Sequence, residues 1–116
     1  ATAKHFAAYG AAQAGRDYHT VDISERTLRD VYLPPFKAAV DEGVATFMTS
    51  FNEYDGVPAS GSKFLLTDVL RDEWGFDGFV VTDYTSINEM VPHGYAKDLE
   101  PAAIWTCRAP CSWKTW

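Results

Sequence analysis

Two short apolar runs, separated by a helix-like segment, restrict the folds open to this chain more than any other feature. Residues 44 to 51 read VATFMTSF, and residues 78 to 82 read GFVVT. Both runs are rich in β-branched and aromatic side chains, which is typical of buried strands. Strands that alternate with helices favour a parallel sheet whose crossover helices cover its faces. We therefore predict an α/β fold with parallel strands.

The first helical pattern lies before the run at 44 to 51. It begins at Asp22-Ile23-Ser24-Glu25, which fits a capping box with Asp22 as the N-cap residue. The dipeptide Pro34-Pro35 interrupts the apolar stripe, so we expect a kink or two short helices. Gly43 is expected to end the pattern.

The second helical pattern covers 62–73, with Ser62 as its cap and Gly75 as its end. The polar segment 52–61 before it contains Gly and Pro and is predicted to be a loop. The opening segment AKHFAAYG is expected to form a further short strand and loop. The chain would then hold about three consecutive βα units.

Composition narrows the function classes. The 116 residues include 47% hydrophobic side chains, which suits one globular domain. A formal net charge of −6 argues against a nucleic-acid partner, because such binding depends on neutralising phosphates. No apolar stretch approaches the roughly 18 residues of a membrane span. Neither GxGxxG nor a P-loop pattern is present, so we expect no nucleotide cofactor.

The histidines and cysteines indicate no metal or redox site. His19 and His93 lack acidic partners at ligand spacing. Cys107 and Cys111 match neither a zinc pair nor a CxxC motif, and they read as incidental thiols, with a disulfide as the alternative. We expect no metal and no cofactor.

Polar residues gather where the three predicted strands end. In parallel α/β folds, ligands bind at the carboxyl ends of the strands. Solvation of strand ends is the alternative explanation of this polarity. The residues at these ends are Lys4 and His5 for the first strand, Phe51, Asn52 and Glu53 for the second, and Asp83 and Tyr84 for the third.

Three long blocks resemble glycoside hydrolase family 3, the family of β-glucosidases and β-xylosidases. The blocks are KHFAAYG, the segment from Gly15 to Ser60, and LLTDVLRDEWGFDGFVVTDY. The resemblance runs from residue 3 to about residue 103, and bacterial periplasmic β-glucosidases look nearest. It implies a partial (β/α)8-type barrel, a β-linked oligosaccharide or aryl glycoside as substrate, and a periplasmic or secreted location, although no signal peptide is visible in this chain.

The resemblance also implies roles for individual residues. The motif Thr82-Asp83-Tyr84 matches the family pattern in which the acid is the nucleophile of a retaining mechanism. Lys4 and His5 match the motif that binds sugar hydroxyls, and Lys4 is expected to be the cation that keeps Asp83 charged. Further candidates for contact with substrate are Tyr84, Phe51, Arg16 and Asp17.

Three of these candidates have ordinary alternatives. Tyr84 fits an aromatic platform for the next sugar but also fits simple packing at a strand end. Phe51 lies where some family members carry Tyr, and it lacks the hydroxyl. Arg16 and Asp17 fit a solvated loop pair as well as a substrate contact.

A retaining glycosidase needs two carboxyl groups, and the family takes its acid/base from a region well downstream of the nucleophile. We therefore interpret residues 1–103 as a fragment of the catalytic barrel domain that lacks the acid/base. Residues 104–116 form an atypical tail, which a shifted reading frame would explain. The alternatives to a nucleophile-bearing fragment are a non-catalytic carbohydrate-binding piece and an inactive truncated product.

We predict that the isolated 116-residue chain self-associates through its exposed strand edges and hydrolyses aryl β-glucosides very poorly. Light scattering during size-exclusion chromatography measures the first property, and release of the phenol measures the second. A monodisperse chain with robust turnover that Asp83→Asn abolishes contradicts this prediction.

Overall fold

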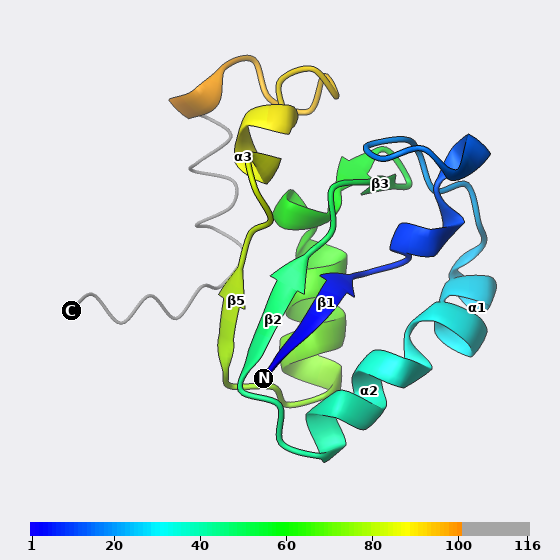
Figure 1. The fold of residues 1–116 in the computed structure, drawn as a ribbon, viewed down its shortest axis with the longest axis vertical. Coiled ribbons are helices and arrows are strands. Elements are labelled where there is room, and N and C mark those ends of the chain that lie inside the picture. Colours follow the sequence, from blue (N-terminus) through cyan, green and yellow to red (C-terminus); the bar gives the residue numbers. More distant parts are fainter. Residues whose placement is uncertain (101–116) are drawn as a thin grey trace.

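The computed structural model describes residues 1–100. The predictions made for Cys107, Cys111 and the tail at 104–116 lie outside the described residues. Within the described part, three strands form one sheet in the order β1-β2-β5, and both pairings are parallel (Figure 1). The strands are β1 (Thr2–Phe6), β2 (Thr46–Thr49) and β5 (Phe79–Val81). The predicted α/β architecture with parallel strands is confirmed.

The first crossover consists of three short helical segments. They are α1 (Glu25–Thr27), the π-type turn η3 (Leu28–Tyr32) and α2 (Pro34–Asp41). The prolines stand in the first turn of α2, as expected from their missing N–H groups. The prediction of Asp22 as N-cap is wrong. The side chain of Ser24 accepts from the Thr27 amide at 3.1 Å and caps α1 instead.

The second crossover is the helix η5 (Phe64–Glu73), which has π-type hydrogen bonding. The Ser62 hydroxyl oxygen accepts from the Leu65 amide at 3.2 Å, so the predicted cap is confirmed. Gly75 has a φ of +66°, a left-handed conformation that ends helices and suits glycine. The remaining short elements are η1 (Tyr9–Ala11), η2 (Gln13–Gly15), η4 (Ala59–Gly61) and α3 (Ser86–Glu89).

The segment 52–61, predicted to be a loop, contains a small hairpin. Strands β3 (Glu53–Tyr54) and β4 (Val57–Pro58) pair in an antiparallel manner. Asp55 and Gly56 connect them with φ values of +53° and +77°. Positive φ at both central residues is what a type I′ hairpin turn requires, and Asp-Gly is a preferred sequence for it. The turn signal was present in the sequence, but the strands were too short to show a pattern.

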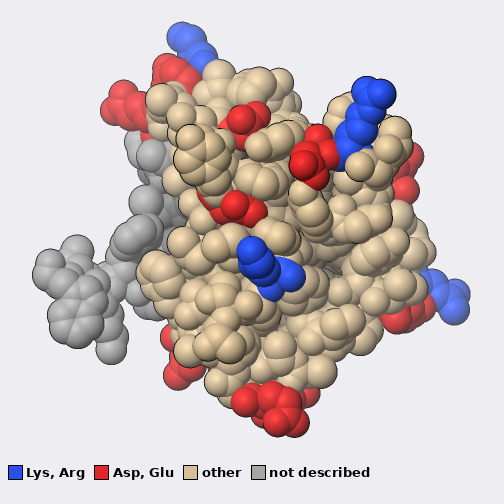
Figure 2. Space-filling model, viewed as in Figure 1, with Lys and Arg blue, Asp and Glu red and all other residues tan. Residues whose placement is uncertain are grey.

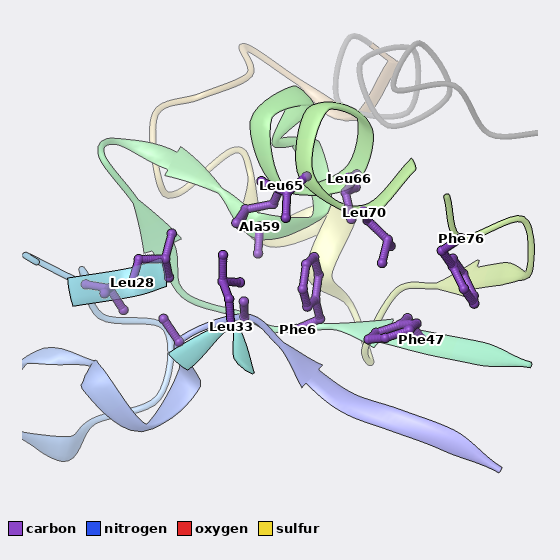
Figure 3. Packing of buried hydrophobic residues seen from close by; sticks show 13 residues of the cluster. Phe6, Leu28, Leu33, Phe47, Ala59, Leu65, Leu66, Leu70 and Phe76 are labelled. Carbon is purple, nitrogen blue, oxygen red and sulfur yellow. The ribbon is translucent and has the colours of Figure 1, made fainter. Parts of the chain in front are cut away.

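The core lies between the sheet and η5, and aromatic rings from both layers meet there (Figure 3). The ring of Phe47 on β2 lies 5.4 Å from that of Phe6 and 4.9 Å from that of Phe76, both edge to face. Such pairs add about 0.5–1.5 kcal/mol beyond the burial of their area. The other large, fully buried apolar side chains of this cluster are Leu28, Leu65, Leu70, Val21 and Val69.

The opposite face of the sheet is open. In Figure 1 the helices lie behind and beside the strands, and Figure 2 shows a front surface over the strands with few charged groups. Phe79 on β5 is 55% exposed, and the side chains of β2 alternate between half-buried and buried. The prediction that the run GFVVT is fully buried is therefore wrong for the described residues. The run is apolar on both faces, but the helices described here cover only one.

Gly78 permits the close approach of β5 to β2. A Cβ atom there would lie 2.4 Å from the backbone oxygen of Ala45, which accepts from the Phe79 amide. We predict that Gly78→Ala lowers the free energy of unfolding by about 1–3 kcal/mol, because backbone atoms must move apart. Gly10→Ala is the matched control, since a Cβ there meets nothing within 4 Å. Chemical denaturation of both variants measures the difference, and equal stabilities would contradict the assignment.

Candidate active site at the strand ends

The carboxyl ends of β1, β2 and β5 meet at one edge of the sheet, beneath the loops that follow them (Figure 1). The pairings Ala3 with Phe47 and Phe6 with Thr49 leave two residues of β1 opposite the single residue Met48. These two residues are Lys4 and His5. A bulge of this kind re-aims side chains locally. Lys4 and His5, which the sequence predicts as site residues, therefore lie together on this edge.

His5 and Asp83 make the central contact of the site. Their strands are separated by β2, so the two backbones lie about 9.6 Å apart, twice the usual spacing between strands. The His5 Nε2 atom nevertheless lies 3.2 Å from Asp83 Oδ2. Both side chains must therefore lean over β2 on the same face of the sheet. They are 27% and 16% exposed, so a ligand can still reach them.

The backbone holds the second oxygen of the carboxylate. The Tyr84 amide donates to Asp83 Oδ1 at 2.6 Å, and the Ser86 amide donates to the Asp83 carbonyl oxygen. Each carboxylate oxygen thus has one contact from the protein. Lys4, expected to be the cation beside Asp83, forms no ion pair within the described part of the chain. The side chain that contacts Asp83 in the described residues is the imidazole of His5.

Tyr9 and Asp17 extend the site on the far side of His5. The ring of Tyr9 lies 5.0 Å from that of His5, and its hydroxyl donates to the carboxylate of Asp17. This hydrogen bond, with burial and the charges of Asp17 and Asp83, raises the pKa of Tyr9 to about 12. Asp17 therefore joins the site through Tyr9. The side chain of Arg16 is exposed and makes no hydrogen bond or ion pair with another described residue.

The loops on this edge also carry aromatic side chains. Phe51 follows β2 and is half-buried beneath the ring of Tyr18, with ring centroids 4.5 Å apart. Tyr84 is 81% exposed. Phe51 and Tyr84 are predicted site residues, whereas the sequence reasoning did not identify Tyr9 or Tyr18. Tyr9 stands in the same KHFAAYG block as His5, and that position could have suggested it. Tyr18 carried no signal, because only the fold brings it to Phe51.

Buried polar groups support the loop after β1. The Ala7 carbonyl oxygen accepts from the Ser50 hydroxyl at 3.1 Å and from the Asn52 side-chain amide at 3.4 Å. The Phe6 carbonyl oxygen accepts from the Ser50 amide at 2.8 Å. These bonds join the end of β2 to the residues directly after His5. Ser50 and Asn52 are buried, so their hydrogen bonds are shielded from competing water.

A parallel sheet with an imidazole–carboxylate contact at its carboxyl edge is the arrangement of α/β domains whose ligand sites lie at the strand ends. Comparison with known proteins gives the family. The N-terminal domain of glycosyl hydrolase family 3 matches residues 1–106, and the chain belongs to that family.

Several relatives are similar over most of this chain. A periplasmic β-glucosidase of Salmonella typhimurium is 50% identical over 99 residues, which are 85% of this chain and 13% of that protein. A β-xylosidase of Formosa agariphila is 45% identical over 111 residues, 94% of this chain and 15% of that protein. The chain thus spans only 13% and 15% of the length of these two relatives.

A solved structure is also similar. A β-glucosidase from Listeria innocua in complex with glucose superposes with a TM-score of 0.90 at 45% identity, over 93% of this chain and 15% of that one. The similarity supports the partial barrel predicted for the fold. Within residues 1–100, no helix is long and apolar enough to cross a membrane.

The pKa of Tyr9 can be tested directly. Because it is raised in the folded state, the neutral phenol stabilises the fold below about pH 10, and this stabilisation is lost as the pH rises towards 12. We predict that Asp17→Asn shifts the pKa of Tyr9 down towards 10, the ordinary value for tyrosine. Titration of ¹³Cζ-labelled tyrosine by NMR measures the shift.

Asp22→Asn is the control for this titration, since Asp22 is an exposed carboxylate nearby in the sequence. It should leave the Tyr9 signal unchanged. If Asp17→Asn leaves the pKa of Tyr9 unchanged, the hydrogen bond to Asp17 is not what raises that pKa.

Proposed function

We propose that Asp83 is the nucleophile of a retaining β-glycosidase that acts on terminal β-linked glucose or xylose. The observation that carries the proposal is the contact between His5 and Asp83 at the strand ends of a family 3 chain. The named relatives include β-glucosidases and a β-xylosidase, which supports both sugars. A glucose complex is recorded for the Listeria innocua relative.

In the proposed reaction, a carboxylate oxygen of Asp83 attacks the anomeric carbon and forms a glycosyl-enzyme. The bond from that carbon to the leaving oxygen breaks, and a general acid supplies the proton that the leaving oxygen takes up. Water then hydrolyses the glycosyl-enzyme with the same group acting as base. None of residues 1–100 is assigned as that acid/base, and we place this group elsewhere in the active enzyme. Residues 1–103 would be one part of its barrel domain.

The neighbours of Asp83 suit the binding of a sugar. Lys4 and His5 offer donors to sugar hydroxyls, and the contact from His5 also holds the carboxylate in one orientation. The exposed ring of Tyr84 offers a surface for the apolar face of the next unit. Phe51, Arg16 and Asp17 complete the proposed contacts, with Asp17 held by Tyr9. A periplasmic or secreted location is proposed by analogy with the Salmonella typhimurium relative.

Covalent labelling tests the nucleophile. The experiment uses the longest natural polypeptide that carries residues 1–116. We expect 2,4-dinitrophenyl 2-deoxy-2-fluoro-β-D-glucoside to label Asp83. The dinitrophenolate of this reagent is a good leaving group, so the labelling step needs little help from a general acid. Peptide mass spectrometry locates the label. Asp83→Asn should abolish it, whereas Asp77→Asn, which changes an exposed carboxylate before β5, should retain it.

Labelling at a different carboxylate would overturn the assignment of Asp83. If the protein binds glucose but no residue is labelled, the non-catalytic carbohydrate-binding alternative is favoured. If it neither binds nor is labelled, the chain has no glycosidase role of its own.

A further inference from the structure

Tyr18 has a backbone conformation that a bulky residue rarely adopts. Its φ is +66°, in the left-handed region that favours glycine. Such a conformation is unfavourable and persists only where the surroundings enforce it. Strained residues of this kind gather at functional sites, so Tyr18 requires an explanation beyond the course of its loop.

The position of the Tyr18 ring relates this strain to the candidate active site. The ring packs on Phe51 at 4.5 Å, and Phe51 follows β2, the central strand of the sheet. Phe51 follows the last residue of β2 by two positions, and Tyr84 follows the last residue of β5 by three. The Tyr18 ring therefore lies at the carboxyl edge of the sheet, where His5 and Asp83 meet.

Charges near the phenol agree with this placement. Burial raises the pKa of Tyr18, and the carboxylates of Glu89, Asp17 and Asp83 raise it further. These three acids stand on different segments: Glu89 on α3, Asp17 on the loop after η2, and Asp83 after β5. The Tyr18 phenol thus lies within electrostatic range of the candidate nucleophile.

The tyrosines at this edge are more exposed than the carboxylate. The side chain of Asp83 is 16% exposed, whereas Tyr18 is 37% and Tyr84 is 81% exposed. A glycone bound by Lys4 and His5 would occupy the floor of the site. The part of the ligand that projects outward past Asp83 would then meet the two tyrosine rings.

We propose that Tyr18, supported by Phe51, is a specificity-determining residue whose ring contacts the leaving-group moiety and favours aryl over small alkyl aglycones. The inference rests on the proposed glycosidase function, since it assumes that the glycone occupies the floor of the site. The proposed contact also explains the strain at Tyr18, because the unfavourable φ places the ring at the carboxyl edge of the sheet. A glycine at this position would relieve the strain but present no ring.

Binding of two unreactive ligands tests the inference. The affinities of phenyl and methyl 1-thio-β-D-glucoside are measured by calorimetry in the longest natural polypeptide that carries residues 1–116. We expect the wild-type protein to prefer the phenyl compound, and Tyr18→Ala to reduce that preference about fivefold to tenfold, which lies within the range for one aromatic contact. Tyr18→Phe keeps the ring and should retain the preference within about twofold.

Two further variants separate binding from folding. Phe79→Ala removes a half-exposed ring at the opposite end of β5 and should leave the phenyl-to-methyl ratio unchanged. Tyr18→Gly should lose the preference without a lower melting temperature, because relief of strain offsets the lost packing on Phe51. A purely structural tyrosine would instead lower the melting temperature and leave the ratio unchanged.

The outcomes distinguish this inference from the proposed function. If the wild-type protein binds both thioglucosides equally, or if Tyr18→Ala leaves the ratio unchanged, the inference is refuted and the assignment of Asp83 stands. If the wild-type protein binds neither thioglucoside nor the corresponding thioxylosides, the proposed function fails and the inference fails with it.

Discussion

The parallel pairing of β1, β2 and β5 is the constraint on which the rest of the structure depends. Because all three strands run in one direction, their carboxyl ends meet at one edge, and His5 and Asp83 come together despite their distance in sequence. His5 and Asp83 belong to strands that are not neighbours, so their contact at 3.2 Å requires β2 between them and both side chains on one face. A strand in the opposite direction would send one of these residues to the other end of the sheet.

The pairing in turn depends on a core built on one side of the sheet only. Rings from β1, β2 and the segment after η5 interlock there, and η5 covers them (Figure 3). The opposite face carries half-buried and exposed side chains, among them Phe79. Parallel sheets are ordinarily covered on both faces, and in a closed barrel this face would point inward.

Much of the fold was predictable, because each βα unit has a local signal. The β-branched runs located β2 and β5, Ser62 marked the start of η5, and the prolines marked the first turn of α2. The prediction for the start of α1 was wrong because two neighbouring residues could each serve as its N-cap. Asp22 and Ser24 are both good caps, and only the hydrogen bond to Thr27 distinguishes them. The hairpin β3–β4 was missed because two-residue strands have no period to detect.

The family, the order of the elements and the presence of a carboxylate at the end of β5 could be predicted from the amino-acid sequence, because these depend on residues close together in the chain. Tertiary structure alone decided which groups touch that carboxylate. His5 rather than Lys4 contacts Asp83, and the ring of Tyr18 packs on Phe51. These contacts join residues more than thirty positions apart, and their geometry follows from strand register and side-chain packing, which no local pattern encodes.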